Sequence, residues 1–143
     1  MNIDSINNGY VIDHITAGKA MEIYKLLKLN EVDSQVAIIT NAKSKKSGKK
    51  DIIKIDKDID IDIDALGFID HNVTVNVVKN SEIIEKRKLT LPERIVNLAA
   101  CNNPRCITSI EKDLDQIFIL TDRENEVYRC RYCEMSLKQK NQK

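Results

Sequence analysis

The sequence predicts an α+β chain in two parts: a mainly antiparallel sheet with two helices on one face, then a small β domain. Two observations predict this organisation. Segments rich in β-branched residues alternate with two helical segments in the first 90 residues. All four cysteines follow Pro92, beyond which the helix and strand signals become short. A chain of 143 residues is long enough for one ordinary domain or two small ones.

Five segments of the first part predict strands: four are rich in β-branched residues, and the fifth follows the turn at residues 79–81. They are residues 11–15, 36–40, 51–56, 73–78 and 82–89. Residues 17–29 place apolar side chains on one helical face and predict a helix. Isoleucine and aspartate alternate with strand period in residues 56–70, but we favour a short helix over residues 62–69, which would complete a β–α–β unit. The order β-α-β-β-α-β-β predicts a ferredoxin-like sheet.

The connections are marked by polar residues, glycine and proline. Residues 43–50 are lysine-rich, contain Gly48 and predict a hairpin connection between two strands. Pro92 marks the expected domain boundary, with one domain over residues 1–90 and the second over residues 91–143. We interpret residues 91–95 as a connector in which Pro92 opens a helical turn.

Charge and hydropathy exclude several classes of partner. The formal net charge is +1, and basic and acidic residues also balance within each part of the chain, which argues against a general attraction to nucleic acid or to an anionic membrane. The N-terminus shows no positive cluster followed by an apolar run, and no apolar stretch approaches the ~20 residues of a membrane helix. We therefore expect a cytoplasmic protein without a signal peptide or membrane span.

The four cysteines form two closely spaced pairs, Cys101 with Cys106 and Cys130 with Cys133. Such pairs on two short loops direct four thiolates at one centre, as a tetrahedral zinc site requires. Thiols stay reduced in the cytoplasm, which favours a metal site over disulfides. Four sulfurs leave no open position, so we expect one structural Zn²⁺ per chain in a zinc-ribbon or rubredoxin-like fold. Free cysteines, two disulfides and an iron–sulfur cluster are the alternatives.

A candidate anion site is scattered over the first part of the chain. Asp13 and His14 end the first predicted strand, and Lys54 and Lys86 lie on later strands. Such positions can converge in an antiparallel sheet, where two ammonium groups and an imidazole would suit a triphosphate. Spacing alone favours the ordinary alternative, in which each lysine is solvated and the histidine is packed or exposed.

Five ordered motifs spanning roughly residues 3–135 resemble the regulatory chain of aspartate carbamoyltransferase. They are GYVIDHI at residues 9–15, GKKDIIKI at 48–55, VTVN at 73–76, LPERI at 91–95, and the cysteine pattern ending in CRYCE at 130–134. The resemblance implies a chain that is not an enzyme. It implies an N-terminal domain that binds the nucleotide effectors CTP and ATP and pairs with a second regulatory chain. It also implies a C-terminal zinc domain that grips the catalytic chain and thereby controls pyrimidine synthesis.

The resemblance also carries over individual positions. The four cysteines match the family's zinc ligands, and Lys54 would lie near the base and ribose. His14, Lys50 and Lys86 would lie near the phosphates. The remaining effector positions implied by the resemblance are Val11, Asp13, Asn76, Val78 and Ile83. Ser81 departs from the family's pattern, since an aromatic residue can occur there.

A rival interpretation of a different class is a nucleic-acid-binding zinc ribbon, in which residues 43–50, Arg129 and Arg131 contact phosphates. The balanced charge and the shortage of stacking aromatic residues argue against it. An enzyme finds little support, because the chain has two histidines, no glycine-rich phosphate loop and no nucleophile motif. We expect His71, which adjoins Asn72 in a turn-like stretch, to be exposed.

Overall fold

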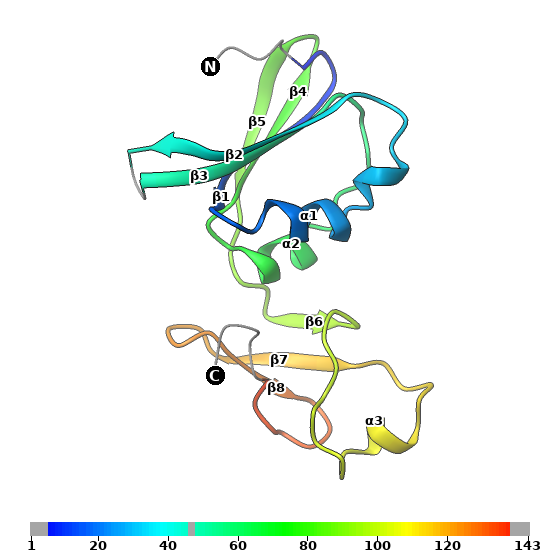
Figure 1. Ribbon diagram of the computed structural model, residues 1–143. Helices are drawn as coiled ribbons and strands as arrows, with labels where there is room; N and C mark the ends of the chain where they lie inside the picture. The colour runs from blue at the N-terminus through cyan, green and yellow to red at the C-terminus, as the bar shows by residue number, and fades with distance from the viewer. Residues whose placement is uncertain (1–5, 46–47, 138–143) are drawn as a thin grey trace. The chain divides into compact units, whose positions relative to one another are not determined.

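The computed structural model describes residues 6–45 and 48–137. The chain divides into two compact units, Met1–Thr90 and Leu91–Lys143 (Figure 1). Each unit is built around its own antiparallel sheet. Within the described residues, no helix has the length and apolar character needed to cross a membrane.

The first unit is a five-stranded antiparallel sheet with strand order β2-β3-β1-β4-β5. Its strands are β1 (Gly9–Thr16), β2 (Val36–Ser44), β3 (Gly48–Ile55), β4 (Thr74–Lys79) and β5 (Glu82–Lys88). Helix α1 (Ala20–Leu26) connects β1 to β2, and α2 (Ile63–Ile69) connects β3 to β4. This is the predicted ferredoxin-like order with one added edge strand, so the prediction of fold class is confirmed, including the helix favoured over residues 62–69.

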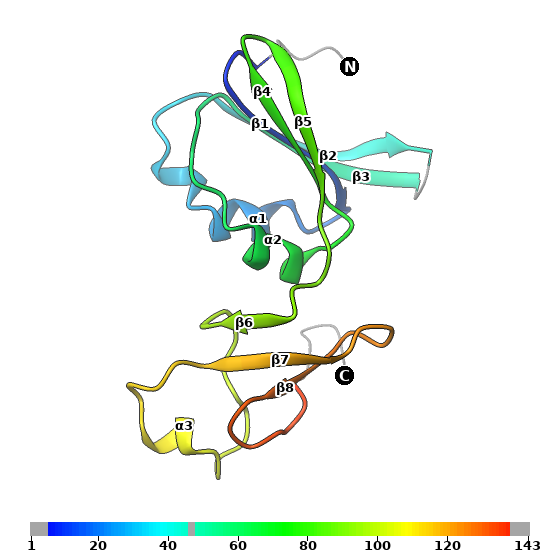
Figure 2. The same cartoon turned by 180° about the vertical axis from the view of Figure 1, so that it is seen from behind.

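Both helices lie on the same side of the sheet (Figures 1 and 2). The core between them is aliphatic, with strand residues Ile12, Ile53 and Val75 packed in one cluster with Ile23 of α1 and Leu66 of α2. These five side chains are at most 1% exposed. Because side chains alternate along a strand, the residues between these positions point to the other face, which the helices do not cover. We call this second face the open face.

Helix α1 ends earlier than predicted. Lys28 adopts a left-handed conformation with φ 53°, and the chain continues as a short 3-10 turn, Leu29–Glu31. Leu29 is 2% exposed, so the turn keeps the apolar side chain in the core although the α-helix has ended. The predicted hairpin connection is also shorter than expected, since the strands extend to Ser44 and from Gly48.

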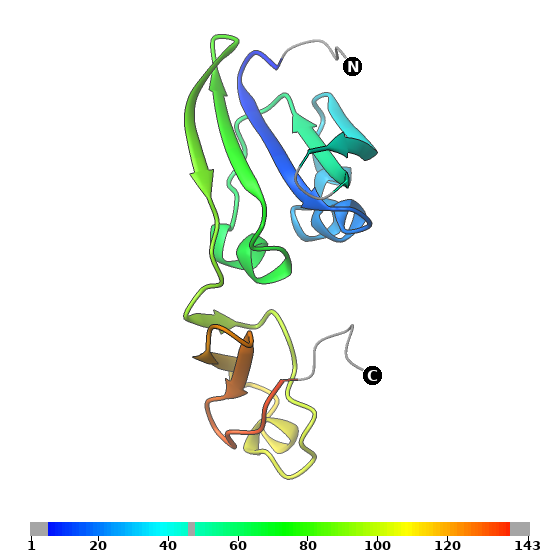
Figure 3. The ribbon, with the colours of Figure 1, turned by 90° about the vertical axis from the view of Figure 1, so that its left-hand side faces the viewer.

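The second unit contains a three-stranded sheet, β6-β7-β8, and the short helix α3 (Ile107–Ile110). The strands are β6 (Arg94–Val96), β7 (Ile117–Asp122) and β8 (Val127–Cys130). The expected helical turn at Pro92 is wrong, because the residues after it pair with β7. Ile95 is buried opposite Phe118, and the Pro92 carbonyl accepts a hydrogen bond of 2.6 Å from Tyr128. Figure 3 shows β6, β7 and β8 as one small sheet.

Candidate functional site

The metal centre is formed by two loops of the second unit. Cys106 is the N-cap residue of α3, and the loop before it carries Cys101. Cys130 is the last residue of β8, and Cys133 lies in the turn that follows. Cys106 and Cys130 are buried, whereas Cys101 and Cys133 are partly exposed. The spacing of the cysteines thus lets a helix start and a strand end contribute two sulfurs each.

The distances between the sulfurs fit one metal ion. All four Sγ atoms lie within 4.8 Å of one another. The Sγ–Sγ distance is 3.6 Å between Cys101 and Cys133 and 3.7 Å between Cys106 and Cys130. A tetrahedral zinc ion about 2.3 Å from each sulfur separates them by about 3.8 Å, whereas a disulfide needs about 2.05 Å. The geometry matches a structural Zn²⁺ site with four thiolate ligands.

The surroundings of the cysteines shift the pKa values of their thiols in opposite directions. Burial raises the pKa of Cys101 to about 12, while hydrogen bonding from the Asn103 side chain lowers the pKa of Cys133 to about 6. The Thr108 hydroxyl donates a hydrogen bond of 3.1 Å to Cys106 Sγ, which lowers the pKa of that thiol. Metal binding requires the thiolates, so the centre releases protons when the ion binds.

The open face of the first unit brings predicted effector residues into one row. Val11 of β1 pairs with Lys54 of β3 on one side and with Asn76 of β4 on the other. Asn76 in turn pairs with Lys86 of β5. Four residues from four strands therefore form a continuous row across the sheet, with a lysine at each end. We call it the Lys54–Lys86 row.

The Asn76 side chain leaves an unused acceptor in this row. Its Nδ2 donates to the Val11 carbonyl at 3.2 Å, and its Oδ1 is buried without a hydrogen-bond partner in the described part of the chain. Asn76 is 8% exposed. A buried unpaired amide oxygen costs free energy, so a ligand donor that reached Asn76 Oδ1 would relieve that cost.

A second row lies next to the first. Asp13 pairs with Thr74, which pairs with Lys88. His14 follows Asp13 with φ 59°, and its Nδ1 lies 3.2 Å from Thr74 Oγ1. Lys50 Nζ lies 3.0 Å from Asp13 Oδ1. Asp13, His14 and Lys50 thus lie close together beside the Lys54–Lys86 row, on the side where Thr74 and Lys88 pair.

A cleft of about 780 Å³ adjoins this second row. Its lining includes His14, Thr74, Lys49, Lys88 and His71. Of these five, only His14 was among the predicted site residues, although the alternation of β5 signalled Lys88, two positions after Lys86. The expectation that His71 is exposed is wrong: its side chain is half-buried in the cleft wall. Basic side chains therefore gather in this cleft, although the net charge of the whole chain is close to zero.

Val78 and Ile83 lie apart from the basic groups. They pair with each other near the β4–β5 turn, where Val78 is 5% exposed and Ile83 is 54% exposed. Ser81 in that turn donates a 2.6 Å hydrogen bond to Asn7 Oδ1. The polar Ser81 therefore ties the turn to the segment before β1, at the apolar end of the open face.

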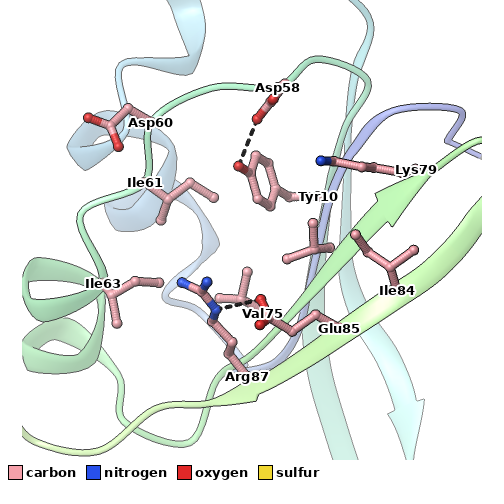
Figure 4. Close-up of a pocket in the computed structure, with 11 residues that line it drawn as sticks. Tyr10, Asp58, Asp60, Ile61, Ile63, Val75, Lys79, Ile84, Glu85 and Arg87 are labelled. Atoms are coloured by element: carbon pink, nitrogen blue, oxygen red, sulfur yellow. Dashed lines mark hydrogen bonds and ion pairs between the residues drawn. The ribbon is translucent and has the colours of Figure 1, made fainter.

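A smaller hollow of about 310 Å³ lies on the other side of the sheet (Figure 4). Four of its polar side chains are already paired with one another. Tyr10 donates to Asp58 at 2.9 Å, and Arg87 Nε lies 2.7 Å from Glu85 Oε2. None of the predicted effector residues lines it, so the candidate site remains on the open face.

Comparison with known proteins matches both units to one family. Residues 1–90 match the aspartate carbamoyltransferase regulatory chain, allosteric domain, and residues 93–143 match the metal binding domain of the same chain. The aspartate carbamoyltransferase regulatory chain of Clostridium botulinum strain Hall is 54% identical over 134 residues, covering 94% of this chain and 92% of the relative. That of Bifidobacterium longum is 45% identical over 138 residues, covering 96% and 99%.

These relatives are named as regulatory chains of the enzyme, not as catalytic chains. The metal binding domain coincides with the unit that gathers the four cysteines, and the allosteric domain coincides with the unit that carries the open face. This chain belongs to the family of aspartate carbamoyltransferase regulatory chains.

Proposed function

We propose that the open face binds the nucleotide effectors CTP and ATP, and that the chain uses this binding to modulate aspartate carbamoyltransferase and pyrimidine synthesis. The observation that carries the proposal is the Lys54–Lys86 row, in which two lysines flank an unpaired buried acceptor. A ribose hydroxyl or an exocyclic amine of the base supplies the donor that Asn76 lacks. Compact ammonium groups suit the triphosphate.

The arrangement of the residues supports a direction for the nucleotide. Val78 and Ile83 form the apolar end of the open face, which suits the base, and the Lys54–Lys86 row lies between that end and the second row. Asp13 lies in the second row, where it would hold Lys50 toward the phosphates. His14, Lys50 and Lys86 would contact the phosphates, and the cleft beyond them adds Lys49 and Lys88.

The second unit is proposed to dock on the catalytic chain. Several of its large apolar side chains are exposed: Ile107 (44%), Ile110 (70%), Leu114 (38%), Tyr132 (38%) and Met135 (47%). Ile107 and Ile110 belong to α3, Tyr132 and Met135 lie beside Cys133, and Leu114 follows α3. A metal ion at the four cysteines would therefore fix most of the backbone that presents them. Exposed apolar side chains of this kind mark interaction surfaces.

The proposed assembly is a cytoplasmic hetero-oligomer in which two regulatory chains pair and each grips a catalytic chain. Nucleotide binding and catalytic state would then be linked by a coupling free energy of about 1–3 kcal/mol. An effector shifts that equilibrium only if it binds one state of the assembly more tightly. The connector around Pro92 is the route by which the first unit would act on the second.

Calorimetric titration of the metal-loaded chain with CTP and ATP tests the nucleotide site. Lys86→Ala is expected to weaken triphosphate binding by on the order of tenfold, because a charged hydrogen bond to phosphate is lost. Lys79→Ala is the matched control, since it removes the same charge from the same hairpin but lines the hollow on the other face. Equal affinity in wild type and Lys86→Ala would refute the phosphate assignment.

A further inference from the structure

A buried carboxylate beneath the open face is not part of the proposed nucleotide contacts. Asp51 lies in β3, is 1% exposed, and shares the core-facing side of the strand with Ile53 and Ile55. A carboxylate in an aliphatic layer is destabilising unless hydrogen bonds compensate its lost hydration. The surroundings of Asp51 therefore have to supply strong donors.

Three backbone N–H groups supply them. Asp51 Oδ2 accepts hydrogen bonds from Gly18 at 3.0 Å and from Ala20 at 3.3 Å. Oδ1 accepts one from Asn41 at 3.0 Å. Gly18 and Ala20 belong to the entry into α1, and Asn41 belongs to β2. One side chain thus joins the helix start and the neighbouring strand to β3.

Both strands that flank β3 are irregular beside Asp51. In β1 the register shifts between Ile12 and Ile15, and in β2 it shifts between Ile39 and Ala42. An extra residue in a strand breaks the ladder and leaves backbone groups unpaired. Asn41 lies inside the β2 irregularity with φ 59°, and Asp51 accepts its N–H.

The β1 irregularity contains the charged residues of the open face. Asp13 and His14 lie between Ile12 and Ile15, and Ile15 is the partner of Asp51 in the ladder. Lys50, the residue before Asp51, points to the open face and contacts Asp13 at 3.0 Å. The backbone positions of Asp13, His14 and Lys50 consequently depend on the same short stretch of β3.

We propose that Asp51 is a positioning residue of the effector site: by anchoring the start of α1 and the β2 irregularity to β3, it sets where Lys50, Asp13 and His14 stand on the open face. The inference rests on the proposed nucleotide site. Asp51 itself lies on the core side of the sheet and contacts no ligand. Its influence is expected on the phosphate end, because Lys50 and His14 are there, and not on the apolar base end near Val78.

Asp51→Asn tests this assignment, because the amide keeps the shape of the side chain but turns an NH₂ group toward a backbone N–H. In calorimetry on the metal-loaded full-length chain, CTP is expected to bind on the order of tenfold more weakly. Cytidine, which lacks phosphates, is expected to keep its affinity. Asp33→Asn, which alters an exposed carboxylate paired with Lys57, is the control and should bind CTP like wild type.

A double-mutant cycle with Lys50→Ala separates positioning from a general loss of structure. If Asp51 acts through Lys50, the effect of Asp51→Asn on CTP affinity shrinks when Lys50 is already absent. Equal losses for CTP and cytidine, or no loss for either, would overturn the inference. Failure of the wild-type chain to bind any nucleotide would instead overturn the proposed function.

A milder variant keeps the test decisive if Asp51→Asn does not fold. Gly18 has φ 98° and donates to Asp51, and a Cβ added there meets no atom within 4 Å. Gly18→Ala therefore strains only the backbone at this anchor. It should lower CTP affinity in the same direction, by a smaller factor, and leave cytidine unchanged. An unchanged CTP affinity in folded Gly18→Ala would contradict the positioning role.

Discussion

Asp13 shows how single residues set the charge of the open face. Burial by itself would raise the pKa of its carboxyl, but hydrogen bonds from Lys50 and from the His14 N–H outweigh burial and hold the pKa below its usual value. The folded pKa therefore lies below the unfolded value of about 3.9. The resulting stabilisation is present above that pH and is lost as the pH falls through the folded pKa.

Asp13→Asn should remove this acid-sensitive contribution. The difference in free energy of unfolding between wild type and variant is expected to be constant from about pH 7 to pH 5 and to shrink below about pH 4. Urea unfolding followed by circular dichroism at a series of pH values measures it. A difference that stays the same down to about pH 3 would show that Lys50 and Asp13 do not interact as described.

Thr108 illustrates a residue that acts on the metal through its ligand. Thr108 is 2% exposed, and its hydroxyl donates to Cys106 Sγ at 3.1 Å. Thr108→Val keeps the shape and removes the donor, so metal affinity should fall by about 10–100-fold. Competition with a chromophoric chelator measures the change, with Thr121→Val, at an exposed position of β7, as control. Identical affinities in Thr108→Val and wild type would exclude a role for this hydrogen bond.

At the scale of elements, α2 depends on a close approach to the end of the first unit. Gly67 is buried in α2, and a Cβ added there would lie 2.6 Å from the Thr90 carbonyl oxygen. Alanine would gain about 1 kcal/mol in helix propensity. The clash involves a backbone oxygen, which cannot rotate away as a side chain can. The overpacking cost of about 1–3 kcal/mol should therefore exceed the gain in helix propensity.

Gly67→Ala is therefore expected to destabilise the chain although it strengthens the isolated helix. Thermal unfolding should show a lower midpoint for Gly67→Ala than for wild type. Asp64→Ala, at an exposed position of the same helix, is the control and should change the free energy of unfolding by less than about 0.5 kcal/mol. A higher midpoint for Gly67→Ala would mean that the backbone at Thr90 moves away from the added methyl group at little energetic cost.

The sequence predicts these elements well where one face of each is apolar. The β-branched runs locate β1 to β4, the turn after β4 locates β5, and the Asp62 side chain accepts a hydrogen bond from the Ala65 N–H at the start of α2. β6 was missed because it has only three residues and follows a proline, a combination that also opens helices. Its buried Ile95 opposite Phe118 decides in favour of a strand.

The two candidate sites also differ in how far the sequence predicts them. Cysteine spacing alone predicts which residues gather, because each pair lies within one loop. Predicting which residues meet on the open face requires the cross-strand register. The irregularities of β1 and β2 change that register, and no local sequence pattern predicts them. Asp51 did leave a signal, since the alternation of Asp51, Ile53 and Ile55 places an acid on an apolar face.

For the whole molecule, the two units carry separate tasks. The metal ion organises the second unit, whose sheet has only three strands, and structural zinc contributes about 10–16 kcal/mol in small zinc peptides. The first unit has its own aliphatic core and contains no cysteine. Loss of the metal should therefore unfold the second unit and leave the first intact.

Metal removal with a mercurial should release one Zn²⁺ as four thiols react. Nucleotide binding to the open face should survive, because none of the proposed contacts lies in the second unit. Calorimetry with CTP on the treated chain, alongside a thiol count and a zinc indicator, measures both. Abolished CTP binding would show that the first unit depends on the metal centre.

Sedimentation of the zinc-loaded chain mixed with the aspartate carbamoyltransferase catalytic chain of its own organism tests the central claim most directly. A regulatory chain whose metal centre presents a docking surface should shift the catalytic chain to a much larger complex, and mercurial treatment should abolish the shift. Unchanged sedimentation of both components in zinc-replete buffer would contradict the proposed role of the second unit in gripping the catalytic chain.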